Sequence, residues 1–247
     1  PGQISQEITK LVKHGLRILK TFGFNDYTIY LSTQPEKYAG TAEGWRKATN
    51  TLKYVLKKLK LKYRPDPGGG VFYGPKIDIK IKDSLSREWQ CTTIQFDFNL
   101  PERFEMTYVD KKGKKVRPYM IHRALLGSVE RFFGVLIEHT AGNFPLWLAP
   151  VQVTLLTVTD RADEYAQNIK DRLDQEGIRI HLDLRNEKLG LKIREAKMQK
   201  IPYLVVLGDA EVTGNTLSVT SREGEKDAHL SIDEFLSKLH KRLLEKK

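Results

Sequence analysis

The hydrophobic rhythm of the chain changes near Pro150, and this change constrains the fold more than any other feature. Between Lys62 and Val109 the side chains follow a period of two, strictly so in Ile77–Asp83. This pattern predicts antiparallel strands with one apolar face and one face at a site or in water. After Pro150, apolar strands alternate with helical patterns in the order βαβαβ. That order predicts a largely parallel sheet.

The length of 247 residues exceeds the usual size of one domain, so we expect two. The segment Ala141–Pro150 contains a glycine, a tryptophan and two prolines, and it predicts the end of a helix followed by a short linker. We therefore place one domain at residues 1–147 and a second at residues 148–247.

In the first domain the patterns predict amphipathic helices at 4–21 and 44–59, strands at 26–31 and 88–98, and a polar hairpin turn at 110–114. In the second they predict strands at 151–158, 178–184, 203–207 and 216–221, with helices at 162–175 and 188–200. Ser231–Glu234 is a capping box that opens a last helix, and Gly208–Glu211 is expected to form a turn. No GxGxxG loop follows the strands, so nothing indicates a dinucleotide site.

Composition narrows the function classes. The net charge of +11 and the pI near 9.5 favour a polyanionic partner. One cysteine excludes an internal disulfide, and neither a signal peptide nor an apolar run of membrane-spanning length is present. A reducing compartment, by default the cytoplasm, is the expected location.

The stretch Arg117–Gly134 is the most specific part of the sequence. Tyr119–Leu125 indicates a short buried strand, Gly127 and Ser128 a turn, and the following residues a helix from Val129 to about Glu138. The glycine allows a ligand to approach the backbone, and Arg131 can lay its planar guanidinium on an adenine ring or a phosphate. The alternative is a buried strand followed by an ordinary surface arginine.

Gly127–Arg131 resembles the third signature motif of class II aminoacyl-tRNA synthetases, which here spans residues 125–134. Phe72–Lys76, Trp89–Phe98 and Met120–Ala124 resemble the threonyl-tRNA synthetases in particular, and the resemblance covers nearly the whole chain. It implies an α+β fold, in which part of a class II antiparallel-sheet catalytic domain precedes an α/β anticodon-binding domain with a mixed, mainly parallel sheet. The implied activity is ATP-dependent activation of threonine and its transfer to tRNA(Thr).

The resemblance also implies roles for individual residues. Lys76 would face phosphates and Arg131 the adenine of ATP, which makes these two the candidate catalytic residues. The candidate substrate-binding residues are Tyr73, Gln90 at the ribose, Gln95, His122 and Ser128. ATP would enter with Mg²⁺.

Zinc is the implied resident metal, with His122 as one ligand. Zinc can separate threonine from isosteric valine because valine offers it no oxygen. The alternative is that His122 is a satisfied core residue, and Cys91 is expected to be a buried small hydrophobe. Motifs 1 and 2 and the other zinc ligands of the family do not match any part of this sequence, so we expect this chain alone to be inactive.

In the second domain, Asp183–Lys188 and Gly208–Glu211 resemble the anticodon-binding domain shared by the threonyl, prolyl, histidyl and glycyl enzymes. Asn186 and Glu211 are the expected base readers. The supporting cations are expected to be Arg185, Lys188, Lys192 and Arg194. The alternative is ordinary loop polarity.

Two further questions stay open in the sequence. We interpret the lysines at 53, 57, 58 and 60 as a solvated helix face, and the alternative is a contact with the tRNA backbone. The expected partners are tRNA(Thr), threonine and ATP, with a homodimer for the full-length enzyme. The rival function is a non-catalytic tRNA-binding protein or accessory factor derived from a synthetase.

Overall fold

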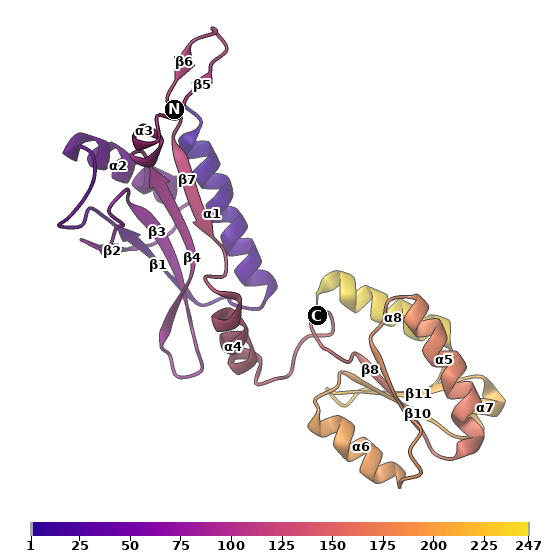
Figure 1. The fold of residues 1–247 in the computed structure, drawn as a ribbon. Coiled ribbons are helices and arrows are strands. Elements are labelled where there is room, and N and C mark those ends of the chain that lie inside the picture. Colours follow the sequence, from indigo (N-terminus) through magenta and orange to yellow (C-terminus); the bar gives the residue numbers. More distant parts are fainter. Residues whose placement is uncertain (1, 247) are drawn as a thin grey trace. The chain divides into compact units, whose positions relative to one another are not determined.

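The computed structural model describes residues 2–246 and divides them into two compact units, with the division between His139 and Thr140 (Figure 1). Each unit is built around its own five-stranded sheet. Among the described residues, no helix is long and apolar enough to cross a membrane.

The sheet of the first unit has the strand order β2-β1-β3-β4-β7. Its strands are β1 (Tyr27–Ser32), β2 (Arg64–Asp66), β3 (Lys76–Lys82), β4 (Glu88–Asp97) and β7 (Met120–Ala124). All neighbours run antiparallel except β1 and β2, which are parallel. The predicted antiparallel sheet is confirmed.

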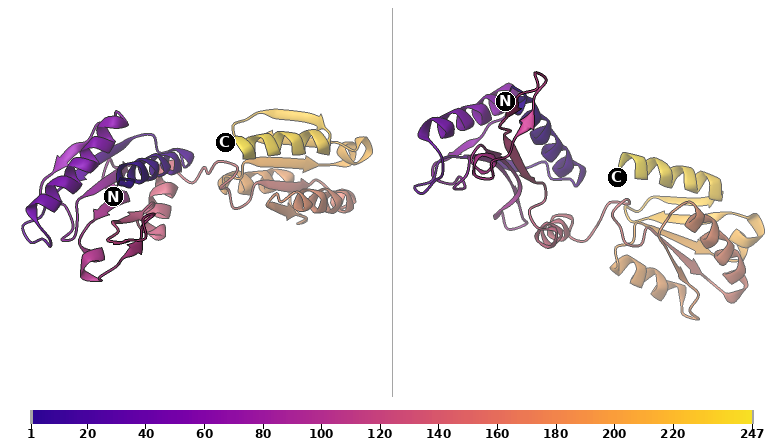
Figure 2. Two further views of the ribbon diagram at one scale, coloured as in Figure 1. Left: turned by 90° about the horizontal axis from the view of Figure 1, so that it is seen from above. Right: turned by 45° about the horizontal axis from the view of Figure 1, so that its top comes forward.

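Helices α1 (Ile4–Thr21) and α2 (Ala42–Lys58) pack side by side on one face of this sheet (Figures 1 and 2). Three isoleucines of β3 point into that interface and are fully buried: Ile77, Ile79 and Ile81. The opposite side chains of β3 were expected at a site or in water. Asp78 is only 2% exposed, because its carboxylate is enclosed by the donors of Gln90 and Thr93.

The rest of the first unit consists of short elements and one longer helix. The short helix α3 (Leu100–Arg103) was not predicted, whereas the polar hairpin of β5 (Tyr108–Val109) and β6 (Lys115–Val116) is confirmed. The helix after the glycine turn is α4 (Val129–Thr140). Strand β7 was expected to be buried, but its residues are half-buried or exposed, because among the described strands it pairs only with β4.

The sheet of the second unit has the order β12-β11-β10-β8-β9. Its strands are β8 (Val153–Thr157), β9 (Ile180–Asp183), β10 (Tyr203–Leu207), β11 (Leu217–Ser221) and β12 (Lys226–Leu230). The pairs β10/β8 and β8/β9 are parallel, and β10/β11 and β11/β12 are antiparallel. The sheet is therefore mixed, as predicted. Strand β12 was missed because Lys226–Leu230 carries little apolar alternation, and it enlarges the antiparallel part.

Helices cover both faces of this second sheet (Figure 1). On one face, α5 (Asp163–Gln175), which follows the 3₁₀ turn η1 (Asp160–Ala162), and α8 (Ile232–Glu245) share the main core with β8 and β10. On the other face, α6 (Leu189–Met198) packs on Leu204 through Ala196 and Ile193. The capping box at Ser231 is confirmed: its Oγ accepts from Glu234 N, and a Glu234 carboxylate oxygen accepts from Ser231 N. The expected turn at Gly208–Glu211 is wrong, since a short helix α7 (Asp209–Gly214) begins there.

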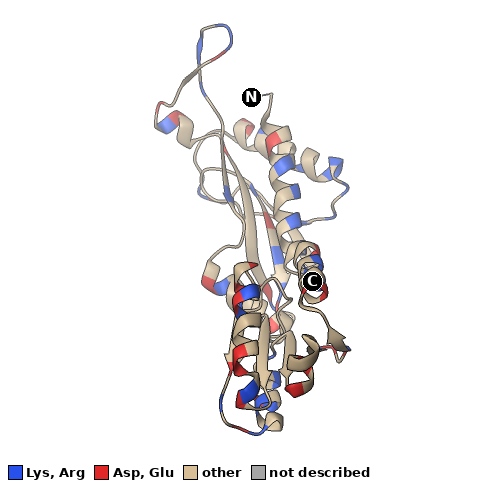
Figure 3. Cartoon of the chain, turned by 90° about the vertical axis from the view of Figure 1, so that its right-hand side faces the viewer, with Lys and Arg blue, Asp and Glu red and all other residues tan. Residues whose placement is uncertain are grey.

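Basic residues occur on helices and loops of both units (Figure 3). The α2 lysines 53, 57 and 58, and Lys60 just after the helix, are all exposed, as a solvated helix face requires. A contact between these lysines and RNA stays a prediction.

Candidate functional site

Strand register places three of the predicted site residues in one row across the first sheet. Lys76 of β3 is opposite Gln95 of β4, and Gln95 is opposite His122 of β7. Directly opposed residues on neighbouring strands point to the same face. The structure thus brings together side chains that are up to 46 positions apart in the sequence.

An irregularity in the pairing of β3 and β4 adds Gln90 to the same face. Ile79 is opposite Thr92, but Lys80 is opposite Gln90, so Cys91 is an extra residue in β4. In a regular strand Gln90 and Thr93 would point to opposite faces, because they are three positions apart. With the bulge both reach one carboxylate: Gln90 Nε2 lies 3.0 Å and Thr93 Oγ1 2.8 Å from Oδ1 of Asp78.

A pocket of about 470 Å³ opens on this face of the sheet. Its lining residues come from β4, β7, the glycine turn before α4 and the first turn of that helix: Gln90, Cys91, Thr93, Gln95, His122, Arg123, Ala124, Gly127, Ser128 and Arg131. Gly127 has a φ of +71°, and a Cβ there would lie 3.0 Å from the carbonyl oxygen of Gln90. The turn therefore requires glycine on both conformational and steric grounds.

Arg131 is fixed at its backbone and at its side chain. Its backbone N–H donates to Ser128 Oγ over 3.1 Å in the first turn of α4. Its guanidinium carbon lies 5.6 Å from the ring centroid of Trp89, within the range of a cation–π contact. Ser128 thus has a structural role at the start of the helix in addition to lining the pocket.

Tyr73 lies beside the pocket and orients one of its amides. Its hydroxyl donates to Gln95 Oε1 over 2.5 Å, so the NH₂ group of Gln95 is left as a donor for a ligand. Burial, with a smaller effect of the Asp97 charge, raises the pKa of Tyr73 above its ordinary value. The hydroxyl therefore stays protonated and keeps this orientation at neutral pH.

His122 is held by a buried carboxylate. Its Nε2 lies 2.8 Å from Oδ2 of Asp97, whose side chain is fully buried and whose Oδ1 accepts from the backbone of Asn99 and Leu100. A histidine that gives one ring N–H to a carboxylate and keeps the other nitrogen for a ligand is typical of metal sites. Within residues 2–246, no three His, Cys, Asp or Glu side chains are grouped so that they could hold a metal ion by themselves.

Cys91 is 1% exposed, and burial raises the pKa of its thiol to about 11. It is therefore protonated at neutral pH and poorly suited to bind a metal as a thiolate. The expectation of a buried small hydrophobe is confirmed.

Asp78, which was not predicted from the sequence, connects the candidate residues. It forms an ion pair with Lys76, whose side chain is 13% exposed, and it accepts hydrogen bonds from Gln90 and Thr93. The only signal in the sequence was a carboxylate alternating with isoleucines, and a solvated strand face gives the same pattern. Asp78 fixes the positions of Lys76 and Gln90 at the edge of the pocket.

We predict that Asp78→Asn destabilises the chain by about 3 kcal/mol, because it leaves the mostly buried ammonium of Lys76 without its anion. The matched control is Asp26→Asn, which removes the exposed 3.2 Å pair with Lys82 and should cost below about 1 kcal/mol. Urea unfolding of both variants measures the two costs. Equal costs would contradict the central role of Asp78.

A second candidate site lies at the carboxyl ends of β8 and β9, in the second unit. A pocket of about 310 Å³ is lined there by the last residue of β8, by residues that follow the two strands and by a residue of α6: Thr157, Val158, Thr159, Asp160, Leu184, Arg185, Asn186, Glu187 and Lys192. Ligands often bind beyond the carboxyl ends of parallel strands, where loops meet. Of the predicted anticodon residues and supporting cations, Arg185, Asn186 and Lys192 line this pocket, whereas Lys188, Arg194 and Glu211 do not.

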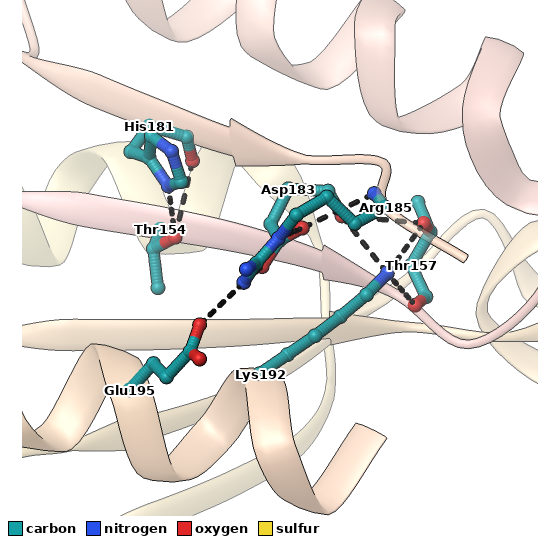
Figure 4. A network of polar contacts seen from close by, with 7 residues as sticks. All are labelled: Thr154, Thr157, His181, Asp183, Arg185, Lys192 and Glu195. Carbon is teal, nitrogen blue, oxygen red and sulfur yellow. Dashed lines mark hydrogen bonds and ion pairs between the residues drawn. The ribbon is translucent and has the colours of Figure 1, made fainter. Parts of the chain in front are cut away.

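Arg185 is engaged inside the unit. Its guanidinium lies 2.7 Å from Asp183 Oδ2 and 2.6 Å from Glu195 Oε2 (Figure 4). The hydrogen bond from Arg185 holds the pKa of Asp183 below its ordinary value. Arg185 is about half exposed, so it can still meet a ligand while it is paired.

Lys192 is not a surface cation, contrary to expectation. It is 2% exposed, and its ammonium donates to the carbonyl oxygens of Thr157 at 3.0 Å and Asp183 at 3.1 Å (Figure 4). These are the last carbonyls of β8 and β9, where the sheet pairing ends. The side chain satisfies them and joins the two strand ends under the pocket.

Asn186 and Lys188 are exposed, as ligand contacts require. Glu211 lies in the first turn of α7, and its carboxylate accepts from Gly208 N over 2.9 Å. It therefore has a structural role at this helix start, and base reading by Glu211 stays a prediction.

We expect Lys192→Met to lower the free energy of unfolding by about 1–3 kcal/mol, because two buried carbonyls lose their donor. Lys188→Met should change it by no more than about 0.5 kcal/mol, since Lys188 is exposed. Urea unfolding compares the two. An unchanged free energy of unfolding in Lys192→Met would contradict this structural role of Lys192.

Comparison with known families assigns both units. Residues 1–140 match the family model "tRNA synthetase class II core domain (G, H, P, S and T)", and residues 152–242 match the model "Anticodon binding domain".

Individual proteins agree with these families. The chain is 50% identical over 237 residues to a threonine–tRNA ligase of Sulfurihydrogenibium sp., covering 96% of this chain and 37% of that protein. It is 48% identical over 246 residues to a threonine–tRNA ligase of Aquifex aeolicus, covering 100% of this chain and 39% of the relative. Its fold matches a crystal structure of the RNA binding domain of threonyl-tRNA synthetase from Cryptosporidium parvum Iowa II, with a TM-score of 0.92 and 37% identity, over 98% of this chain and 61% of that one. The resemblance and the fold class predicted from the sequence are confirmed.

Proposed function

Because the chain belongs to the class II tRNA synthetase core-domain family, we propose that it forms part of a threonine–tRNA ligase. The whole protein would activate threonine with ATP to threonyl-adenylate, transfer it to tRNA(Thr) and recognise the anticodon through the second unit. The chain spans less than two fifths of the curated relatives that it matches, so this activity belongs to a longer protein.

One observation carries the proposal: the row Lys76–Gln95–His122 lies on the sheet face where the pocket opens, with Arg131 at the wall of that pocket. A pocket of this kind offers polar groups to an amino acid at one end and a planar cation to an aromatic base at the other.

The proposed roles follow this order across the pocket. Gln95, oriented by Tyr73, and His122 meet the amino acid, and Lys76 meets phosphate oxygens. Gln90 meets the ribose, while Ser128 starts the helix that presents Arg131 to the adenine. ATP would enter with Mg²⁺, whose charge offsets that of the phosphates.

Zinc fits the chemistry of His122. The imidazole is held through Nε2 by a buried carboxylate, which leaves Nδ1 as a lone-pair donor when the ring is neutral. When bound, zinc would act as a Lewis acid that takes the amino and hydroxyl groups of threonine. Its other ligands would come from parts of the protein outside this sequence.

For the second unit we propose that Asn186 and Glu211 read anticodon bases and that Arg185 and Lys188 contact the RNA. The exposure of Asn186 and Lys188 supports these roles. A homodimer and a cytoplasmic location are the corresponding proposals for the whole protein.

The test is threonine-dependent ATP–pyrophosphate exchange by the longer protein that contains this sequence. We predict exchange with threonine, a loss of at least tenfold in His122→Ala, and a parallel loss of bound zinc, because an incomplete ligand set binds the metal weakly. The matched control is His14→Ala, which changes a surface histidine hydrogen-bonded to Arg17 and should alter neither quantity.

Two results would contradict the proposal. Tight tRNA binding without any exchange would favour the non-catalytic accessory factor. Normal zinc content in His122→Ala would make His122 a structural residue.

A further inference from the structure

The guanidinium of Arg131 has a partner that neither the sequence motif nor the family comparison assigns. Arg131 is exposed at the pocket, and its guanidinium carbon lies 5.6 Å from the ring centroid of Trp89. Trp89 belongs to β4, where it is opposite Ile81 and directly precedes Gln90. The indole thus comes from the same strand that supplies much of the pocket.

Trp89 is itself held in place. Its indole Nε1 donates to Oδ2 of Asp83 over 2.8 Å. A second guanidinium, that of Arg87, lies 5.8 Å from the indole and donates through Nε to the same carboxylate oxygen over 2.6 Å. The indole therefore cannot rotate freely without breaking a hydrogen bond to an enclosed acceptor.

Asp83 anchors this arrangement at the end of β3. Its side chain is 1% exposed, and its Oδ1 accepts from the backbone of Leu85 and Arg87 at 2.9 Å each. Burial raises its pKa, but the hydrogen bonds from Trp89 and Arg87 outweigh that effect and bring it to about 2. The carboxylate is therefore charged at neutral pH and accepts donors from three residues.

We propose that Trp89 is a positioning residue that holds the guanidinium of Arg131 flat at the wall of the pocket, ready to stack on the planar base of a nucleotide. This inference rests on the nucleotide role proposed for Arg131. It adds a chain of contacts from Asp83 through Trp89 to Arg131. These contacts hold the side chain of Arg131, whereas the hydrogen bond to Ser128 holds only its backbone.

The physical basis is the conformational freedom of arginine. A free arginine side chain carries about 2 kcal/mol of rotamer entropy, and a stacked ligand can bind it only after that freedom is lost. The planar, delocalised guanidinium can stack on the indole with one face and on a base with the other. Trp89 orders the side chain before the nucleotide arrives, so the ordering no longer opposes nucleotide binding.

The test uses four variants of the longer protein: Arg131→Ala, Trp89→Leu, Trp89→Phe and the double variant Trp89→Leu/Arg131→Ala. KM for ATP and KM for threonine are measured separately in the exchange reaction. Trp89→Leu should raise KM for ATP about threefold to tenfold and change KM for threonine less than twofold. Trp89→Phe keeps an aromatic face and loses the indole N–H, so it should lie between Trp89→Leu and the unchanged protein.

The double variant separates positioning from a general structural role. If Trp89 acts through Arg131, the double variant is no worse than Arg131→Ala alone, because the partner is already gone. The control is Leu85→Ala, which changes an exposed residue in the turn between β3 and β4. It should leave both KM values unchanged.

The outcomes distinguish the two levels of the account. An unchanged KM for ATP in Arg131→Ala would overturn the nucleotide role of Arg131. Two other results would overturn the positioning role of Trp89 and leave the proposed function intact. In the first, KM for ATP rises in Arg131→Ala but in neither Trp89 variant. In the second, it rises in both single variants and the two effects multiply in the double variant.

Discussion

The buried carboxylate of Asp78 is the interaction on which the candidate site depends most. A carboxylate that is 2% exposed is costly unless donors and a cation surround it, and here Lys76, Gln90 and Thr93 do so. The same contacts fix the side chains that face the pocket. Stability and site geometry therefore depend on the same contacts of Asp78.

The sheet provides the second constraint. Its register sets Lys76, Gln95 and His122 in a row, and the extra residue Cys91 in β4 turns Gln90 to the same face. The turn at Gly127 then brings the start of α4 against β4. Glycine suits this close approach because its φ is +71° and an added Cβ would lie 3.0 Å from the carbonyl oxygen of Gln90. The pocket is thus a product of strand pairing and one tight turn, on which side chains of suitable chemistry are placed.

Many of the helices and strands were predicted from local patterns, because helical periodicity and capping depend on residues that are close in the sequence. Helix α1 has the bounds that its apolar stripe predicted, and the capping box at Ser231 opens α8. Pairing across the sheet is not local: the burial of Asp78, the contact of Trp89 with Arg131 and the burial of Lys192 depend on residues distant in sequence. A lysine beside a loop has the same sequence signature whether it faces solvent or closes two strand ends. The family resemblance supplied the candidate residues, and the structure shows what holds them.

The most direct measurement is a crystal structure of the longer protein with a non-hydrolysable analogue of threonyl-adenylate. The account predicts the adenine on the guanidinium of Arg131, the ribose beside Gln90 and the threonyl group between Gln95 and His122. It also predicts that Asp78 keeps its contacts with Lys76 and Gln90 in the bound state. An analogue bound elsewhere, or bound in this pocket with its adenine away from Arg131, would contradict the account.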